Sequence, residues 1–375
     1  MTPSTTHLMG VIGTLVAIDV AFRLITWAYY SDTERVLRIL NLQPRSDGPR
    51  TPYYKRFDAV LAPLPFLWTW IEIFLMVWLA NYFDHAIAWV LAIVIIGGRF
   101  RALQEFGHNA VHFALCKSHE WQWFLSDYFY QFPSFKRDMH SRHVTHTREH
   151  HKNPNHVSLD PNRARVRDGG MAYPLTERQF YARLLYPLTP KGQKVNITTM
   201  LRNSMLNHSK TTTVIRCICL LQFALTFFLL AGWKGIVLGW FAPLLTTYAL
   251  FAWLALLAEH RWFVSGSFEN RRELECLAGR PTDYSGLSGW MVRILVSPTS
   301  DAYHLAHSLY PGVRWNYLPT IDRILKITDS RYTAHASEGL IFSKHGAPSA
   351  LSELRDRLVI SELEQHSSGV QGVGG

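Results

Sequence analysis

The chain has 375 residues, of which 48% are hydrophobic and 18% are charged, whereas ordinary soluble domains carry roughly 25% charged residues. Its net charge of +10 is accompanied by no zinc-finger, helix-turn-helix or RNA-binding signature, so nucleic acid is not an expected partner. The charge deficit is confined to a few apolar stretches, which indicates an integral membrane protein whose basic loops contact membrane lipids. The four cysteines form no Cys-x-x-Cys pair, so a thiolate metal site is not expected.

Two pairs of apolar segments approach the roughly 20 residues that a bilayer crossing requires. The first pair covers residues 59–83 and 86–98, and the second covers residues 214–233 and 235–258. Short turns at Asp84-His85 and around Lys234 separate their members. We therefore expect an all-α integral membrane protein with two transmembrane helical hairpins under a helical cytoplasmic cap that carries the histidines.

Residues 9–30 are a weaker candidate for a fifth membrane helix. They contain Asp19 and Arg23 four residues apart, which could pair within a membrane helix or mark a helix lying in the membrane plane. The sequence further predicts three regions: an apolar segment and basic loop at 1–58, a catalytic membrane domain at 59–325, and a C-terminal tail at 326–375 with a disordered end. Proline, asparagine, glycine and arginine predict a loop over 153–174.

The distribution of basic residues predicts the orientation in the membrane. The turns within the two pairs contain only Lys234 as a basic residue, whereas the stretch from 31 to 57 contains six: Arg35, Arg38, Arg45, Arg50, Lys55 and Arg56. By the positive-inside rule this stretch faces the cytoplasm. The histidine-rich segments then fall on the same face of the membrane.

The first histidine set is His108 and His112, which a helix would place on one face. The spacing is similar to that of zinc proteases, but Asn109 stands where the general-base glutamate of that mechanism is required. A metalloprotease is therefore not expected. Imidazole remains a common neutral ligand of iron, zinc and copper, so both histidines are candidate metal ligands.

The second set has five histidines between residues 140 and 151. On a helical wheel His143, His146 and His150 fall within about 60° of one another, with His151 adjacent. A solvated basic helix is the alternative interpretation, and His140 and His156 are expected to be bystanders. Farther along, Glu259 and His260 form an ionisable pair at the end of the last apolar segment, which is costly unless the pair binds something.

The third set is His304 and His307, followed by Tyr310-Pro311-Gly312 and Leu318-Pro319. With the first two sets, this pattern resembles the membrane fatty acid desaturase/hydroxylase superfamily, whose three histidine boxes lie on two transmembrane hairpins. The resemblance covers roughly residues 59–325. It implies a non-haem centre of two iron ions that uses O2 as co-substrate, with these metal ligands: His108, His112, His146, His150, His151, His260, His304 and His307.

One position departs from the family's pattern. Ser308 stands where the third box usually has its final histidine, and a serine hydroxyl is a poor iron ligand. His143, Asp301 or a water molecule could complete the ligand shell, or the centre could have one ligand fewer.

The resemblance implies an O2-dependent desaturase that introduces a double bond into an acyl-chain or lipid-like substrate. A hydroxylase or other oxygenase, and a desaturase of a small amino-acid-like metabolite, remain alternatives. A metal transporter or sensor is a more remote one, because transporters generally place polar ligands near the bilayer midplane. The chain has no haem-binding, ferredoxin or dinucleotide motif of its own, so a separate ferredoxin-like or cytochrome b5-like electron donor is expected.

Overall fold

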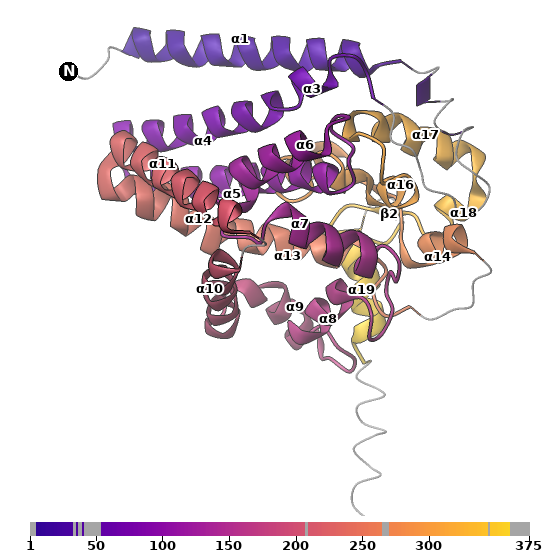
Figure 1. The fold of residues 1–375 in the computed structure, drawn as a ribbon. Helices are drawn as coiled ribbons and strands as arrows, with labels where there is room; N and C mark the ends of the chain where they lie inside the picture. The colour runs from indigo at the N-terminus through magenta and orange to yellow at the C-terminus, as the bar shows by residue number, and fades with distance from the viewer. Residues whose placement is uncertain are drawn as a thin grey trace, which may run out of the picture.

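The computed structural model describes residues 5–32, 35, 36, 40, 54–206, 209–264, 270–343 and 346–360. Across these ranges the chain is predominantly helical (Figure 1), with one sheet of two short parallel strands, β1 (Thr282–Asp283) and β2 (Ser337–Glu338). The predicted disordered end after residue 360, and the basic residues Arg38, Arg45 and Arg50, lie outside the described residues.

Three helical segments are long and apolar enough to cross a membrane: Asp58–Phe83, Ala86–Val111 and Lys210–Glu259. Exposed side chains along them include Ile71, Leu91 and Leu229, which would face lipid. The helices in these segments are α3 (Asp58–Leu61), α4 (Leu64–Phe83), α5 (Ala86–Val111), α11 (Lys210–Lys234), the π-helix η4 (Gly235–Phe241), α12 (Ala242–Leu245) and α13 (Thr247–Glu259). The chain is therefore a mostly helical membrane protein.

The turn between α4 and α5 is tight and locally determined. Asp84 ends α4 in the left-handed conformation with φ 42°, a conformation that aspartate tolerates better than most residues. His85 then caps α5 by accepting a hydrogen bond from the backbone N–H of Ile87. The two apolar helices consequently fold back and pack against each other.

The third segment cannot be one straight helix, because its 50 residues would measure about 75 Å, more than twice the thickness of a bilayer core. The chain leaves helical geometry at Ala231 and Gly232, where Gly232 has φ 58° and ψ −145°. This conformation is essentially restricted to glycine. The predicted reversal around Lys234 is thus displaced to Ala231–Gly232, and the Lys234 ammonium instead pairs with the Asp84 carboxylate at 2.6 Å, which brings the two turns together.

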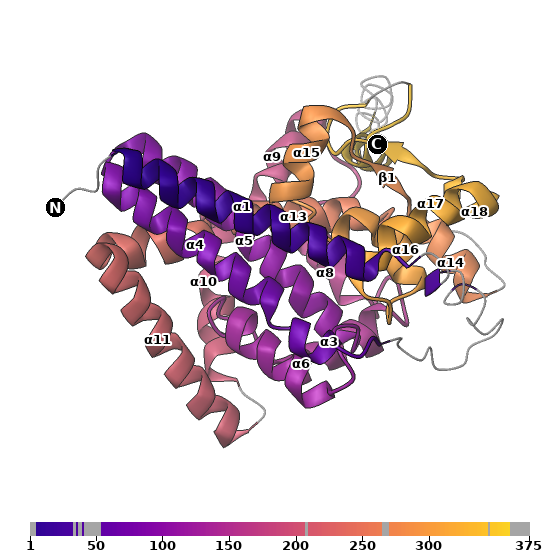
Figure 2. The ribbon, with the colours of Figure 1, turned by 90° about the horizontal axis from the view of Figure 1, so that it is seen from above.

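The N-terminal helix α1 (Thr5–Tyr30) runs alongside α4, and the view from above shows the two helices overlaid (Figure 2). Asp19 and Arg23 pair at 2.7 Å, which is one of the two possibilities that their spacing left open. Asp19 also accepts a hydrogen bond from the indole N–H of Trp68 on α4. Helix α1 has 26 residues, as many as α5, but it is not among the three candidate spans found within the described residues. Whether it crosses the membrane stays a prediction.

Aromatic side chains join the apolar helices into one core. Trp70 of α4 lies 5.6 Å from Phe100 of α5 and 4.2 Å from Phe223 of α11, measured between ring centroids. Its indole N–H donates to the carbonyl of Phe129. Such rings combine a large buried area with favourable ring–ring geometry, so they fix the spacing of the helices that position the histidines.

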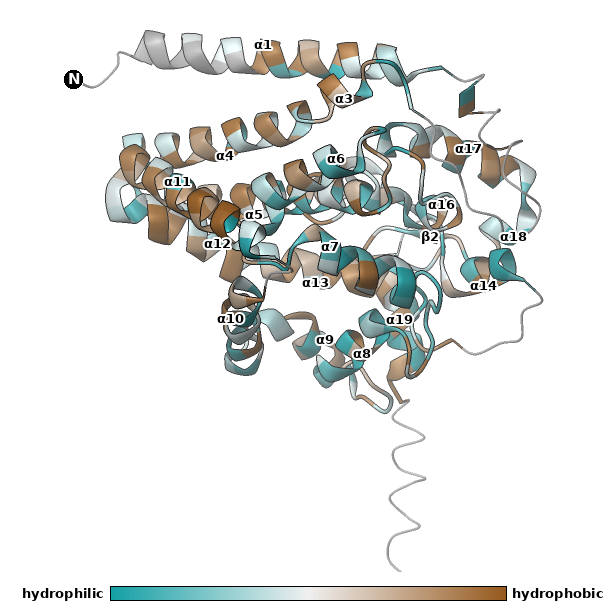
Figure 3. Ribbon diagram, viewed as in Figure 1, coloured by the Kyte–Doolittle hydropathy of each residue, from teal (hydrophilic) through white to brown (hydrophobic). Residues whose placement is uncertain are grey.

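The other helices lie around the ends of α5 and α13 (Figure 1). Hydrophobic residues concentrate on α4, α11 and α12, whereas α8, α10 and α14 are more hydrophilic (Figure 3). These shorter helices are α6 (His119–Ser126), the π-helix η1 (Asp127–Gln131), α7 (Met139–His143), the π-helix η2 (Val144–His150), α8 (Pro161–Asp168), α9 (Glu177–Leu184), the 3-10 helix η3 (Tyr186–Leu188), α10 (Pro190–Met205), α14 (Arg271–Ala278), α15 (Gly286–Leu295), the 3-10 helix η5 (Asp301–Tyr303), α16 (His304–Leu309), the 3-10 helix η6 (Trp315–Tyr317), α17 (Leu318–Thr328), α18 (Ser330–Thr333) and α19 (Ala350–Leu358).

Two details bear on the predicted regions. The loop predicted over 153–174 contains helix α8, so that prediction is wrong for residues 161–168: Asp160 caps the helix and Pro161 occupies its first turn, where its missing N–H costs nothing. Near the C-terminus, α19 buries Leu351 and Leu354 and packs against α13. The three predicted regions themselves stay predictions.

Candidate metal centre

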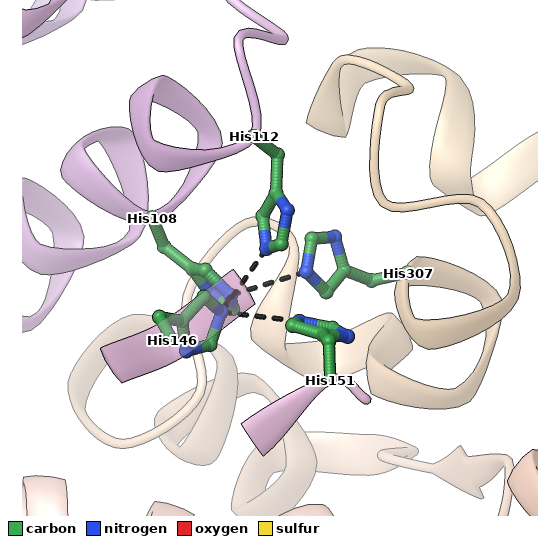
Figure 4. A group of neighbouring side chains, drawn as sticks. All are labelled: His108, His112, His146, His151 and His307. Atoms are coloured by element: carbon green, nitrogen blue, oxygen red, sulfur yellow. Dashed lines mark hydrogen bonds between the residues drawn. The ribbon is translucent and has the colours of Figure 1, made fainter. Parts of the chain in front are cut away.

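Five histidine side chains from three helical segments, α5, η2 and α16 with the residues that cap them, converge on one point (Figure 4). Each offers a ring nitrogen, and these nitrogens all lie within 4.8 Å of one another. The members of this first group are His108, His112, His146, His151 and His307. All five were predicted as ligands, although they are up to 199 residues apart in sequence.

Hydrogen bonding alone cannot account for this convergence. The Nε2 atom of His146 lies 2.7 Å from Nε2 of His108, 3.0 Å from that of His112 and 3.1 Å from that of His151. A single imidazole nitrogen carries either one proton or one lone pair, so it cannot satisfy three such neighbours. Nitrogen ligands about 2.1 Å from one ion and at right angles to each other would lie about 3.0 Å apart. The group therefore fits a divalent metal ion.

The helix α5 positions His108 and His112 one turn apart at its C-terminal end. The carboxylate of Glu105 lies 3.2 Å from Nδ1 of His108, which fixes the tautomer that leaves the Nε2 lone pair facing the group. Gly107, directly before His108, lets α5 approach its neighbours closely. A Cβ at this position would lie 2.7 Å from Oγ of Ser126 and 2.9 Å from the ring of Tyr130.

The second histidine set lies on a π-helix rather than the α-helix assumed by the helical wheel. In η2 the backbone N–H of His151 bonds the carbonyl of His146, five residues earlier. This wider turn places His146 and His151 in the first group, while His150 faces away from it toward His260. The wheel therefore grouped His143, His146 and His150 wrongly, because the π-helical turn holds more residues than the α-helical turn.

A second group lies beside the first and consists of Glu259, His260 and His304. Nε2 of His260 lies 3.1 Å from that of His304 and 3.2 Å from that of His150. His150 is fixed from behind by Asp160, whose carboxylate oxygen lies 2.8 Å from Nδ1. With His150 included, the second group offers three imidazoles and one carboxylate, a donor set that also suits a transition-metal ion.

The short helix α16 contributes one histidine to each group. His304 belongs to the second group and His307 to the first, because a spacing of three residues lets both project from one side of the helix. Ser308 is 1% exposed, and its hydroxyl has no hydrogen-bond partner among the described residues. It belongs to neither group of candidate ligands.

The two possible additional ligands take other roles. Nδ1 of His143 lies 2.8 Å from the carbonyl oxygen of Val111, and His143 is in neither group. Asp301 pairs with the Arg101 guanidinium at 2.7 Å, and its carboxylate lies 3.9 Å from Nδ1 of His304. Both side chains therefore support ligand-bearing segments. The expected bystanders His140 and His156 are exposed and also lie outside both groups.

A buried polar network behind the first group was missed by sequence reasoning. Glu105 contacts Arg101, its oxygen and guanidinium nitrogen lying 3.5 Å apart, and accepts a hydrogen bond from Ser300 at 2.8 Å. Asn109 donates to Ser300 and accepts from the backbone N–H of Trp315. Asn109 thus links α5 to the segment that carries the third histidine set. The charged residues Arg101 and Glu105 within an apolar helix were the available signal.

Burial keeps most of these imidazoles neutral. It lowers the pKa of five of them well below the usual 6.5, and neighbouring imidazoles act in the same direction; the five are His112, His146, His151, His304 and His307. Burial likewise lowers the pKa of His260 to about 3. For His150 burial has the same effect, but the hydrogen bond and charge of Asp160 outweigh it and raise the pKa. Neutral imidazole is the form that binds metal.

Glu259 is a candidate metal ligand that the predicted ligand set did not include. The sequence marks it as half of a costly ionisable pair with His260, and the structure groups its carboxylate with His260 and His304. Carboxylates commonly accompany imidazoles at iron sites. Glu259 is the last residue of α13, and His260 after it adopts an extended conformation.

Comparison with known proteins agrees with this geometry. Residues 84–337, more than half of the chain, match the family model described as fatty acid desaturase. The chain is also 24% identical over 283 residues to the dihydrorhizobitoxine desaturase of Bradyrhizobium elkanii, an alignment that covers 71% of this chain and 76% of that protein. The histidine clusters could hold metal, three segments are apolar enough to span a membrane, and the matched region contains every predicted ligand. The chain belongs to the fatty acid desaturase family.

Proposed function

We propose that this protein is an O2-dependent membrane desaturase whose two histidine groups hold two iron ions. The observation that carries the proposal is the convergence of the eight predicted ligands into two adjacent groups. One group alone would suit zinc or copper equally well. Two neighbouring groups in a member of the desaturase family favour a di-iron centre, and the name of its relative supports desaturation as the outcome.

The proposed reaction converts a CH–CH unit of the substrate into a C=C double bond. Two hydrogens leave adjacent carbons, O2 is reduced to two molecules of water, and a reduced carrier provides two further electrons together with two protons from solvent. Bound iron would supply the activation of O2 that removal of hydrogen from an unactivated carbon requires.

The protein's own residues prepare the site for this chemistry. Glu105 and Asp160 orient His108 and His150 so that their Nε2 lone pairs face the two groups. Burial of the imidazoles keeps them neutral and limits access of bulk water, which would otherwise intercept a strong oxidant. The network of Arg101, Glu105 and Asp301 ties α5 to the segment before α16.

We further propose four membrane crossings arranged as two hairpins, with both histidine groups on the cytoplasmic side. The contact between Asp84 and Lys234 supports this arrangement, because it brings the turns of the two pairs together. The basic residues between 31 and 57 favour a cytoplasmic position for the opposite end. Electrons would come from a separate ferredoxin-like or cytochrome b5-like donor, to which a chain of net charge +10 offers complementary charge.

The metal content of the protein tests the proposal directly. Protein purified anaerobically in detergent should contain about two irons per chain. His146→Ala in the first group and His260→Ala in the second should each lower the iron content, since each removes one imidazole from its group of candidate ligands. The exposed His140→Ala on α7 serves as the matched control and should retain the full content.

Turnover then separates desaturation from hydroxylation. A product two mass units lighter than the substrate would support the proposal, whereas one sixteen units heavier would replace it with hydroxylation. Zinc alone, no bound metal, or equal iron in His140→Ala and His146→Ala would overturn the assignment of the site.

A further inference from the structure

A cavity of about 280 Å3 opens beside the two histidine groups. Its inner wall includes Glu105 and His108 from α5, His146 and His150 from η2, and Glu259 from α13. A molecule bound here would therefore lie next to ligand candidates of both groups. The volume is close to the lower end of the roughly 300–1,000 Å3 typical of small-molecule sites.

The outer wall of this cavity is strongly cationic. Lys136, Arg137, Arg142 and Arg165 all line it. Arg137 and Arg165 are exposed, whereas Lys136 and Arg142 are half-buried, so the positive charge extends from the solvent inward. Among the described residues none of these four cations has a carboxylate within 4.0 Å of its side-chain nitrogens.

Two of these cations lie over aromatic rings, and one of the rings, that of Tyr130, also lines the cavity. The Lys136 ammonium lies 5.3 Å from the ring centroid of Tyr248, and the Arg142 guanidinium lies 5.6 Å from that of Tyr130. The two tyrosines are themselves joined by a hydrogen bond between their hydroxyls at 2.8 Å. Burial, and to a lesser extent the charges of Arg165 and Arg142, lower the pKa of Lys136 to about 7. A bound anion beside the ammonium would favour its charged form.

The remainder of the lining is mostly polar. Ser141 and Thr145 contribute hydroxyls, and amides come from Gln104, Gln131, Asn162 and Asn203. Aliphatic contacts are restricted to Pro161, Ala252 and Leu256. Gln104, Gln131 and Thr145 already bond within the protein. An acyl chain would leave the other polar groups of the lining without partners, at a cost of about 1–3 kcal/mol for each group so buried. A polar, negatively charged molecule would instead satisfy them.

We propose that this cavity binds a small, water-soluble organic acid, whose carboxylate pairs with Lys136 and Arg142 while its hydrocarbon part lies beside the histidines. The proposal deepens the desaturase function proposed above and rests on it. It departs from the expectation of an acyl-chain or lipid-like substrate. The carbons that lose hydrogen would be a few bonds from the carboxylate, since the cations and the histidines line the same cavity.

Binding to the iron-loaded protein in detergent tests the proposal without requiring turnover. The probes are straight-chain carboxylates of four to eight carbon atoms, their 2-amino derivatives, the uncharged amide hexanamide and stearoyl phosphatidylcholine. We expect at least one short acid to bind, and hexanamide to bind at least about tenfold more weakly than hexanoate because the amide cannot form an ion pair.

Charge-removing variants assign the binding to the cavity. Lys136→Gln and Arg142→Gln should each weaken binding of the acid by about 10- to 100-fold, as is usual when a charged hydrogen-bond partner is removed. The matched controls are Lys194→Gln on α10 and Arg178→Gln on α9, which remove exposed cations outside the cavity and should leave binding unchanged. Iron content and thermal unfolding of each variant establish that it is folded.

The outcomes separate this proposal from the function on which it rests. If none of the short acids binds iron-loaded protein, or if Lys136→Gln and Arg142→Gln bind like the wild type, the cavity proposal is overturned while the desaturase proposal stands. Desaturation of stearoyl phosphatidylcholine by the wild type and both cavity variants alike would also overturn it. Protein that binds the acid but contains no iron would leave the cavity assignment supported and refute the proposed function.

Discussion

Glu105 illustrates how a residue that binds no metal can control a metal site. Its carboxylate lies 3.2 Å from Nδ1 of His108 while also contacting Arg101 and Ser300. Replacing it with glutamine keeps the shape but removes the charge that favours the required tautomer. Carboxylates placed in this way behind ligating histidines typically contribute 10- to 100-fold to metal affinity.

We therefore expect Glu105→Gln to weaken iron binding by about 10- to 100-fold. Competition with a chelator of known affinity measures this change. Glu120→Gln, at an exposed position in the first turn of α6, is the matched control and should bind iron like the wild type. An unchanged affinity in folded Glu105→Gln would mean that the carboxylate does not orient His108.

At Ser308 we expect a substitution to leave the metal site intact. Ser308 is 1% exposed, and its hydroxyl makes no hydrogen bond among the described residues. Removing a buried, unpaired hydroxyl is nearly neutral or stabilising. Ser308→Ala should therefore keep its iron content and unfold at the same or a slightly higher temperature. His307→Ala, one residue earlier, should lose iron. Loss of iron in Ser308→Ala would assign the serine to the ligand shell after all.

At the scale of elements, the reversal within the third apolar segment depends on one glycine. Gly232 has φ 58° and ψ −145°, and no atom lies within 4 Å of the place where its Cβ would be. A side chain there would have room but would be held in a strained conformation. Such strain costs on the order of 1–3 kcal/mol.

Gly232→Ala should accordingly lower the free energy of unfolding by about 1–3 kcal/mol, measured by thermal or denaturant unfolding in detergent. Gly10→Ala is the matched control, because Gly10 lies inside helix α1 and also has no atom within 4 Å of its Cβ position. There the substitution should stabilise the protein by up to about 1 kcal/mol. Equal effects at the two positions would argue against a backbone reversal at Gly232.

The π-helix η2 is the element that sequence periodicity described incorrectly. The spacing of the histidines between 140 and 151 suggested a common face at 3.6 residues per turn, whereas the backbone bond from His151 to His146 spans five residues. Local sequence seldom distinguishes these two helical forms, because the extra residue in the turn is stabilised by tertiary contacts. Here those contacts are the convergence of His146 and His151 with α5 and α16.

The pH dependence of stability belongs to the whole molecule, because several buried histidines contribute together. Burial lowers the folded-state pKa of His112, His146, His151, His304 and His307 well below the 6.5 of the unfolded chain. Below pH 6.5 these histidines therefore bind protons in the unfolded chain but remain neutral in the folded protein. Their contribution to stability is intact above pH 6.5 and declines as the pH falls, by about 1.4 kcal/mol per pH unit for each residue.

Metal-free protein in detergent should thus unfold at progressively lower temperature as the pH is reduced from 7 to 5. His150 opposes this trend, since Asp160 raises its pKa, but it is outnumbered. His146→Ala should show a shallower decline, because one of the depressed groups is gone. A melting temperature independent of pH over this range would contradict the assignment of these imidazoles as buried and neutral.

The composition of the chain and the spacing of its histidines were enough to predict membrane helices and candidate metal ligands. Low charge and long apolar runs indicate membrane helices because a bilayer leaves few other solutions for the backbone. The spacing of His108 and His112, and of His304 and His307, places each pair on one side of a helix by local geometry alone. The sequence thus determined the class of protein, its family resemblance and eight histidines that the structure brings together.

Only the tertiary structure decided how those histidines are divided. The pairing of His304 with His260, and of His307 with His108, depends on packing between segments far apart in sequence, which no local period encodes. The same packing buries Glu105 and Asp160 behind the imidazoles and collects Lys136 and Arg142 around one cavity. Side-chain chemistry is fixed residue by residue, whereas a site forms only where the folded chain brings its residues into contact.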